Sequence, residues 1–188
     1  MKLVVAITGA SGAIYAQRLL EALRPEAHDV HVCLSPYARQ VAETELDGGL
    51  QISPAFTTVG DKTMDVPFVS GSAKFDAMVI IPCSMGTLGR IAHGYSDSTI
   101  TRAADVFLKE KRKLIIVPRE TPWNLIQARN VVTLLEAGTT LIPAMPSFYH
   151  RPQTVSEIAD TVVARVLDHL GVTHDLIKRW KQPTESPE

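Results

Sequence analysis

The stretch Leu3-Val4-Val5-Ala6-Ile7-Thr8-Gly9-Ala10-Ser11-Gly12 decides the fold of this chain. It opens with a continuous apolar run, which is typical of a parallel strand that is covered on both faces. The run stops at small and polar residues, and a helical pattern follows at once from Ala13 to Leu23. A buried strand, a glycine-rich turn and a helix in direct succession indicate the first unit of a parallel α/β sheet.

The same alternation recurs along the rest of the chain. Short apolar runs rich in Val and Ile stand at 30–34, 77–81, 114–117 and 140–142, and helical patterns stand at 37–46, 100–111, 123–136 and 155–170. Repeated strand–helix alternation predicts a single Rossmann-like α/β domain, with a doubly wound, mostly parallel sheet and helices on both faces.

Cap residues mark several of the expected helix ends. Thr121 followed by Pro122 is predicted to start the helix at 123–136, and Thr154 is expected to form a capping box with Glu157. Gly138 and Gly171 stand where helix C-caps belong.

Composition excludes several classes of protein. The 188 residues are 45% hydrophobic and 21% charged, with 19 Lys and Arg against 20 Asp and Glu. The net charge of −1 gives no bulk attraction to nucleic acid or to an anionic membrane. No apolar run approaches the roughly 18 residues of a membrane span, and the first run is broken too early for a signal peptide. We expect a cytoplasmic protein with one domain at 1–181 and a polar tail at 182–188.

The two cysteines are expected to be structural. Cys33 and Cys83 stand at the ends of apolar runs, where a free thiol behaves as a small hydrophobic group. Two cysteines make no disulfide framework, and no His or Cys spacing suits a metal. The sequence therefore predicts metal-free chemistry.

In a sheet of this kind, ligands bind outside the carboxyl ends of the strands. The loop Thr8–Gly12 has small residues that let a ligand approach the backbone, and it opens a helix whose free amides favour an anion. Its spacing is G-x-x-G rather than GxGxxG, and the second strand ends in Ser35 rather than an acidic residue. A monophosphate such as flavin mononucleotide (FMN) fits this loop better than a dinucleotide; a tight turn without a ligand is the alternative.

Other strand ends also carry polar groups. Ser84 and Thr87 are either ligand-binding hydroxyls or simple helix caps. Arg119 follows the apolar run 114–117 and could hold a phosphate, with Glu120 beside it to move a proton; a local Arg–Glu pair is the alternative.

The last predicted helix and the loop before it carry two more candidates. Arg165 falls at the edge of the apolar stripe of the helix at 155–170, so it could point outward or turn into a site. The proline-rich loop 143–152 could present the hydroxyl of Tyr149 to a ligand beside it.

Five ordered blocks carry a resemblance to a known family. They are Thr8–Tyr15, Pro82–Met85, Thr101–Val106 together with Leu108–Glu110, Val117–Pro122 and Pro143–Tyr149. With these blocks the chain resembles the UbiX/Pad1 family of flavin prenyltransferases, within the wider flavin-binding cysteine-decarboxylase superfamily. The resemblance runs from Met1 to about Trp180.

The resemblance implies a reaction and its partners. Members of this family join the dimethylallyl group of dimethylallyl phosphate to N5 and C6 of reduced FMN. The resulting prenylated FMN is handed to a decarboxylase of the UbiD type. The family also implies a homo-oligomer, usually a dodecamer, with sites at subunit contacts.

The resemblance also assigns roles to residues. The residues that resemble the flavin-contacting set are Ala10, Ser11, Gly12, Ser35, Ser84, Met85, Gly86, Thr87, Arg102 and Arg119. The residues that resemble the prenyl phosphate site are Lys109, Arg119, Tyr149 and Arg165, with Trp180 as an aromatic residue that closes the site. Glu45 and Glu120 resemble the family's acid/base carboxylates.

Physical reasoning agrees with these roles. A departing allylic phosphate needs cations or a phenol to stabilise its developing charge, and the chain offers Lys, Arg and Tyr but no acidic pair for Mg²⁺. A metal-independent transfer is therefore expected. A positioned carboxylate is also required, because C6 of the flavin must lose a proton.

The resemblance has two departures. Gly86 stands where family members often carry Lys, so it can offer only its backbone. In the segment Trp123–Asn130 the chain differs from the family, which commonly has an acidic helix with a histidine here. This difference concerns the local subunit contacts more than the chemistry.

Two kinds of alternative function remain open. A flavin-dependent cysteine or aromatic-acid decarboxylase would share the flavin site, but the Asn-rich PxMNxxMW block of cysteine decarboxylases is missing here. A non-catalytic FMN carrier would need no second anion site, so Lys109, Glu120, Tyr149 and Arg165 discriminate against it.

Overall fold

The computed structural model of the protein describes residues 1–179. Its centre is a six-stranded sheet in the order β3-β2-β1-β4-β5-β6, in which every neighbouring pair is parallel. The strands are β1 (Lys2–Ile7), β2 (Asp29–Leu34), β3 (Thr57–Gly60), β4 (Ala77–Cys83), β5 (Lys113–Pro118) and β6 (Thr140–Leu141). The strand order reverses between β1 and β4, as in dinucleotide-binding folds, so the predicted doubly wound parallel sheet is confirmed.

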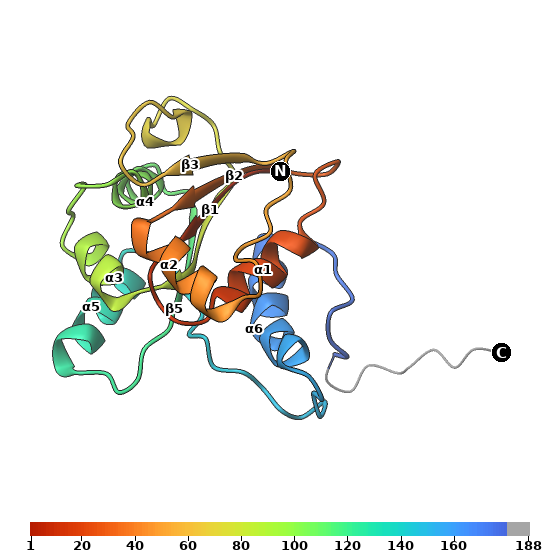
Figure 1. Ribbon diagram of the computed structural model, residues 1–188. Coiled ribbons are helices and arrows are strands. Elements are labelled where there is room, and N and C mark those ends of the chain that lie inside the picture. Colours follow the sequence, from red (N-terminus) through yellow and green to blue (C-terminus); the bar gives the residue numbers. More distant parts are fainter. Residues whose placement is uncertain (180–188) are drawn as a thin grey trace.

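Helices cover both faces of this sheet (Figure 1). The helices are α1 (Ala13–Ala22), α2 (Pro36–Glu45), α3 (Met85–Ala92), α4 (Thr99–Lys109), α5 (Leu125–Glu136) and α6 (Val155–Leu170), with a short 3₁₀ helix, η1 (Pro67–Val69). One hydrophobic core joins the sheet to α1, α2 and α6, and a second joins it to α3, α4, α5 and η1.

The first strand explains why its sequence is apolar without alternation. Leu3, Val5 and Ile7 point into the core beneath α1 and α6, whereas Val4 and Ala6 point into the core beneath α3 and α4. All five side chains are at most 1% exposed. A strand buried on both faces must be apolar at every position, which is the pattern that predicted a central parallel strand.

The cysteines are buried hydrophobic residues, as expected. Cys33 and Cys83 are free thiols without exposed surface. Burial raises the pKa of the Cys33 thiol to about 12 and raises that of Cys83 further still. Neither thiol is therefore a ready nucleophile at neutral pH.

The strand β3 is absent from the sequence-based prediction. It is a four-residue edge strand, Thr57-Thr58-Val59-Gly60, and most of its residues are exposed. An edge strand has one open side and little apolar surface to bury, so it lacks the hydrophobic run that marks the central strands.

The start of α5 corrects a second prediction. Thr121 and Pro122 do not cap the helix; the N-cap is Asn124, which exchanges capping hydrogen bonds with Gln127. Trp123 lies before the helix, and its indole N–H donates to the carbonyl of Glu120. The reciprocal Asn–Gln cap satisfies the free backbone N–H groups three residues later than the Thr-Pro signal suggests, with the N-cap at Asn124 rather than Thr121.

The caps of α6 agree more closely with expectation. The side chain of Thr154 accepts from the backbone N–H of Glu157, but the carboxylate of Glu157 reaches the N–H of Gln153 instead of that of Thr154. Gly138 and Gly171 both adopt left-handed backbone conformations at helix C-termini, with φ of 89° and 79°. Both glycine predictions are confirmed.

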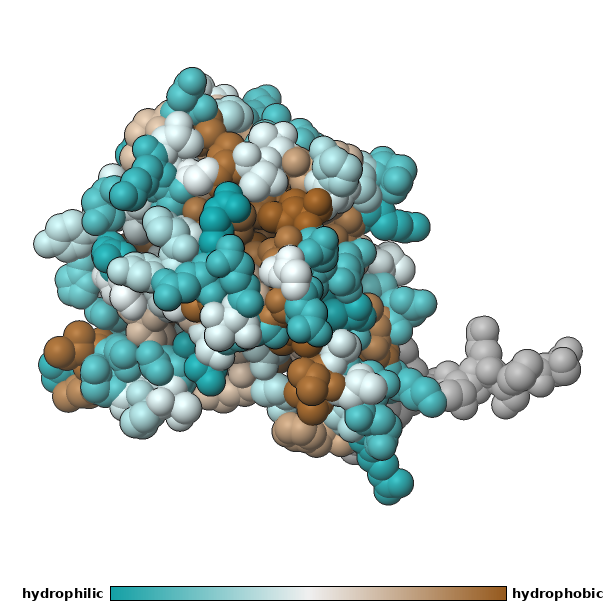
Figure 2. Space-filling view, viewed as in Figure 1, coloured by the Kyte–Doolittle hydropathy of each residue, from teal (hydrophilic) through white to brown (hydrophobic). Residues whose placement is uncertain are grey.

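Apolar residues reach the surface in separate patches (Figure 2). The exposed large hydrophobic residues on α5 are Leu125, Ile126, Val132 and Leu135, and those near the start of α6 are Met145, Phe148, Tyr149 and Val155. Within residues 1–179 no helix is long and apolar enough to cross a lipid bilayer.

Candidate active site

Two loops meet at the switch point of the sheet. The hydroxyl of Thr8, which follows β1, donates to the carbonyl of Pro82 at 2.9 Å and accepts from the backbone N–H of Ser84 at 2.7 Å. These two bonds tie the loop after β1 to the end of β4. Thr8 is itself buried, so its role is to hold the two loops in register.

Gly12 sets the path from the first loop into α1. Its φ is +107°, in the region that residues with a side chain rarely adopt. A Cβ at this position would also lie 2.7 Å from the ring of Tyr15. Backbone conformation and close packing therefore both require glycine here.

Two neighbouring cavities lie at this edge of the sheet. One, of about 400 Å³, is lined by the predicted residues Ser35, Ser84, Gly86 and Thr87. The other, of about 380 Å³, is lined by the predicted residues Ser11 and Glu45. Gly9 and Tyr37 belong to the walls of both cavities, so the two are neighbours, with the close contact between Gly9 and Tyr37 as a shared wall.

The hydroxyls of the first cavity are also helix caps. Ser35 caps α2 by accepting from the N–H of Ala38 at 3.1 Å, and Ser84 caps α3 by accepting from the N–H of Thr87 at 3.3 Å. The hydroxyls of Ser84 and Thr87 lie 3.0 Å apart. The capping interpretation is therefore correct for Ser84. Ser35 still has a hydrogen to donate, whereas the bond between Ser84 and Thr87 uses one of the two hydroxyl hydrogens of that pair.

Glu45 lies at the N-terminus of α1. One of its carboxylate oxygens accepts from the backbone N–H groups of Gly12 and Ala13, both at 2.8 Å. Desolvation alone would raise the pKa of Glu45, but hydrogen bonds from Ser11, Ala13 and Gly12 and the charge of Arg119 outweigh it and lower that pKa. The carboxylate is ionised at neutral pH and can accept a proton.

Arg119 lies close enough to this cluster to act on it. Its charge favours the ionised forms of both Glu45 and Tyr15, although burial holds the pKa of Tyr15 above its usual value. Within residues 1–179 no ion pair joins Arg119 to Glu120, whose carboxylate accepts instead from the N–H of Thr121. The local Arg–Glu pair is thus not formed.

A second group of predicted residues gathers beside α6. The loop that carries Tyr149 is fixed to α6 by a bond from the N–H of Ser147 to the hydroxyl of Thr161. Arg165 is largely exposed at the edge of α6, and its guanidinium donates to Asp168 at 2.8 Å. Arg179 donates to the same carboxylate and is influenced by Tyr149, so these side chains form one cluster.

The remaining predicted cations lie elsewhere in the protomer. On α4, Arg102 donates to the carbonyl of Val69 at 3.2 Å and pairs with Asp105, and Lys109 pairs with Glu110. Neither lines the two cavities of the same chain.

Two other predicted site residues are nearly buried, and a third lies outside the described residues. The side chains of Ala10 and Met85 are only 7% and 6% exposed, so these residues offer mainly their backbone. Trp180 lies outside the described residues.

Several residues of the first cavity were not predicted, among them Tyr37 and Asp61. Tyr37 is 71% exposed near the start of α2, two residues after the capping Ser35. Asp61 follows β3, and its carboxylate accepts from the N–H of Ile100 at 2.7 Å while burial raises its pKa. Tyr37 could have been found from its place after a strand end, whereas Asp61 follows a strand that the sequence pattern does not reveal.

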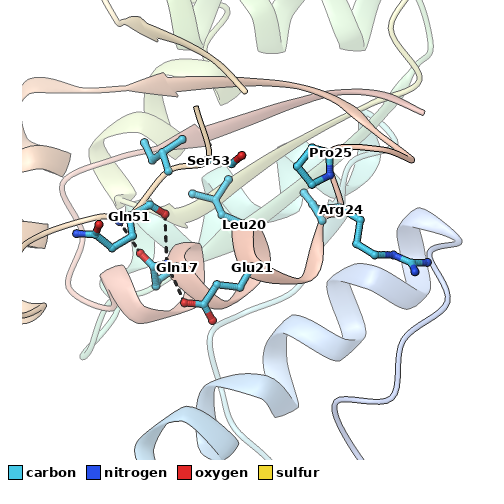
Figure 3. A pocket seen from close by; sticks show the side chains of 9 residues that line it. Gln17, Leu20, Glu21, Arg24, Pro25, Gln51 and Ser53 are labelled. Atoms are coloured by element: carbon cyan, nitrogen blue, oxygen red, sulfur yellow. Dashed lines mark hydrogen bonds between the residues drawn. The ribbon is translucent and has the colours of Figure 1, made fainter. Parts of the chain in front are cut away.

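A further surface cavity is separate from this region. It has a volume of about 420 Å³ and lies between α1 and the segment around Gln51 (Figure 3). Gln17 both donates to and accepts from the backbone of Gln51 across it, which ties that segment to α1. No predicted site residue lines it, so it is not the candidate active site.

The donors of the two neighbouring cavities fit FMN. Hydroxyls at helix N-termini and exposed loop backbone suit a phosphate and a ribityl chain. An exposed tyrosine offers a surface for an aromatic ring, and the space beside Gly86 is open, since a Cβ there would meet no atom within 4 Å. Within the described part of the chain, no group of three or more His, Cys, Asp or Glu residues is placed to hold a metal ion.

Comparison with known proteins supports the same assignment. The Flavoprotein family model matches residues 1–167. The chain is 47% identical to the flavin prenyltransferase UbiX of Methanocaldococcus jannaschii over 96% of this chain and 98% of that protein.

Solved structures agree with the sequence comparison. A dodecameric FMN-dependent UbiX-like decarboxylase from Escherichia coli O157:H7 has a TM-score of 0.89 and 40% identity, covering 97% of this chain and all of that one. AnUbiX (PadA1), solved with FMN and dimethylallyl pyrophosphate, has a TM-score of 0.90 and 34% identity, covering 97% of this chain and 98% of that one. The chain belongs to the Flavoprotein family and, within it, to the UbiX/Pad1 flavin prenyltransferases.

Proposed function

We propose that this protein joins the dimethylallyl group of dimethylallyl phosphate to N5 and C6 of reduced FMN. The observation that carries the proposal is the ionised carboxylate of Glu45, held by Ser11 and the start of α1 beside Arg119 and two neighbouring cavities. When bound, reduced FMN supplies the two nucleophilic atoms of this reaction. The protein must bind that flavin, hold the departing phosphate, remove the proton of C6 and let a proton reach the former double bond of the prenyl group.

Flavin binding falls to the hydroxyl-lined cavity. Ser35 and one hydroxyl of the Ser84–Thr87 pair donate from helix starts, and Gly86 leaves room for a close approach to the backbone. The loop Ala10–Gly12 presents its main chain to the flavin on the other side. Met85 offers its backbone at the start of α3, and Arg102 and Arg119 complete the proposed flavin set.

Phosphate binding requires positive charge and a phenol. Tyr149 and Arg165 lie in the cluster beside α6, and Arg119 lies beside Glu45. Such groups stabilise the charge that develops on a departing phosphate, so the transfer proceeds without a divalent metal.

Lys109 reaches the phosphate from a second subunit. On α4 it lies away from the cavities of its own chain, which favours a site completed at a subunit contact. A homo-oligomer of the kind named for the dodecameric Escherichia coli relative would supply that contact.

Proton transfer falls to the two carboxylates. Glu45 is ionised at neutral pH, which suits a base that takes the proton from C6. Glu120 follows Arg119 directly and is the second acid/base candidate. Trp180, which follows the described residues, is proposed to close the site.

The wider assignment completes the proposal. Residues 1–181 form the catalytic domain and 182–188 a polar tail, and the protein works in the cytoplasm. Its product, prenylated FMN, is consumed by a decarboxylase of the UbiD type.

The test is an anaerobic incubation with reduced FMN and dimethylallyl phosphate, followed by mass spectrometry of the flavin. A flavin that gains the mass of the dimethylallyl group, with and without EDTA, is the expected result. Bound but unaltered flavin would instead favour a carrier. Release of CO₂ from an added cysteine peptide or aromatic acid would favour a decarboxylase.

A further inference from the structure

The carboxylate of Asp168 is shared by three side chains. Arg165 donates to one oxygen at 2.8 Å, Arg179 donates to both oxygens at 3.2 and 2.6 Å, and Nε2 of His174 lies 3.2 Å from the second. Since an ionised carboxylate only accepts, Nε2 of His174 must carry the proton. The pKa of Asp168 is lowered, above all by its hydrogen bond with Arg179, so the carboxylate is ionised.

These contacts draw the chain after α6 back onto the helix. Asp168 and Arg165 are one turn apart on α6, whereas His174 and Arg179 belong to the segment that follows Gly171. The imidazole of His174 is only 4% exposed, so this segment is packed at that point. Arg179 is therefore held at the same place as Arg165 by a partner that both share.

The two arginines keep donors free for a further anion. Arg165 gives only one of its five N–H groups to Asp168, and Arg179 uses its two terminal nitrogens, which leaves N–H groups on each guanidinium. Arg165, Arg179 and Asp168 together carry a net charge of about +1, from two positive charges against one carboxylate. Tyr149 lies near enough to raise the pKa of Arg179, after the larger effect of Asp168.

We propose that Arg179 is a further binding residue for the phosphate of the prenyl donor, and that Asp168 is the positioning residue that holds Arg165 and Arg179 together beside Tyr149. This inference rests on the proposed function, because Arg165 and Tyr149 are the residues that function assigns to the phosphate. The proposal adds Arg179, from the segment after α6, to the residues that bind the phosphate. It also gives a role to the packed imidazole of His174, which contacts Asp168.

The test compares Arg179→Ala, Asp168→Asn and Lys178→Ala in the full-length protein. Lys178→Ala is the matched control, because it removes one positive charge from the exposed neighbouring residue. At saturating FMN, Arg179→Ala should raise the KM for dimethylallyl phosphate roughly five- to thirtyfold, since it removes a charge-assisted contact. Lys178→Ala should keep the KM within about twofold, the size expected for an exposed charge.

Asp168→Asn separates positioning from simple electrostatics. Loss of the negative charge makes the cluster more positive, so an electrostatic effect alone would lower the KM for the phosphate. Positioning predicts the opposite, a rise of roughly three- to tenfold with FMN affinity nearly unchanged, because two arginines lose the partner that orients them. A KM that falls or stays constant in Asp168→Asn, or a wild-type KM in Arg179→Ala, would overturn the proposal.

Inorganic phosphate gives a readout that does not depend on turnover. Calorimetric titration of the FMN-loaded protein with phosphate should show weaker binding in Arg179→Ala than in Lys178→Ala. If the wild type made no prenylated FMN, the proposed function would fail, and this titration would still decide whether Arg179 binds an anion. Equal phosphate affinity in both variants counts against the inference.

Discussion

The carboxylates of Glu45 and Asp168 each accept several hydrogen bonds, but from different kinds of partner. Glu45 accepts from the backbone N–H groups of Gly12 and Ala13, whereas Asp168 accepts only from side chains. The place of Glu45 is thus set by the main chain at the start of α1. The partners of Asp168 are long side chains, and a single substitution at Asp168 can release them.

The difference suits the two tasks. A proton must leave one atom in one direction, so a base held by the backbone is an advantage. A phosphate can be held by several flexible cations, provided that something keeps them together. The predictions below test whether the Glu45 and Asp168 clusters divide the chemistry in this way.

The largest effect is expected from Glu45→Gln. Gln can keep an acceptor near the start of α1 but cannot take the proton, and general base catalysis contributes roughly 10²- to 10⁴-fold. Single-turnover prenylation should therefore slow by roughly a hundredfold or more. Glu43→Gln, which removes an exposed charge from the same helix, is the control. A rate within threefold of the control in Glu45→Gln would remove Glu45 from the role of base.

A smaller loss of prenyl-transfer rate is expected from variants in the Asp168 cluster. Arg165→Ala and Tyr149→Phe should each slow prenyl transfer by roughly ten- to a hundredfold, because one charge-assisted contact to the phosphate is lost. FMN titration should give the wild-type affinity in both variants. If FMN affinity fell in step with the rate, these residues would belong to the flavin pocket instead.

The two clusters also differ in how far the sequence predicts them. Ser35, Ser84 and Thr87 follow central strands, so the rule that ligands bind at strand ends finds them without a structure. Glu45 stands at the end of α2, where no local pattern shows that its carboxylate reaches the start of α1. It was found only through the family resemblance.

Asp168 and Arg179 illustrate a second limit. Asp168 lies in the sequence Leu167-Asp168-His169, which has no feature of a site, and its partners come from a turn and a segment beyond the helix. Such contacts depend on how the chain returns after α6, and local periodicity contains no information on that return. Likewise β3 was missed because an exposed edge strand has no apolar run.

Gly12→Ala tests whether the main chain holds Glu45 in place. Alanine would have to adopt a φ near +107° and would press against the ring of Tyr15, so the free energy of unfolding should fall by about 1–3 kcal/mol. Chemical denaturation measures this change. Gly86→Ala is the matched control, because a Cβ there meets no neighbour within 4 Å and should alter stability by less than about 0.5 kcal/mol. Equal losses in both variants would mean that the loop after β1 tolerates a side chain.

The smallest effect should appear as a pH dependence. The folded protein lowers the pKa of Glu45, so this carboxylate adds stability at pH values above its ordinary pKa of about 4.3. That stability is lost as the pH falls through the lowered value. The contribution should be less than about 1 kcal/mol, because Glu45 is exposed to solvent and its interactions are screened.

Glu45→Gln should therefore be less stable than the wild type at pH 7, and the gap should close as the pH falls below about 4. Urea denaturation at pH 7, 5 and 3 measures the gap, with Glu43→Gln as the control whose gap should stay near zero. If the gap instead stayed constant down to pH 3, the bonds from Gly12 and Ala13 would not depend on the charge of Glu45. The start of α1 would then hold a neutral acceptor equally well, and the contrast with the side-chain partners of Asp168 would concern geometry alone.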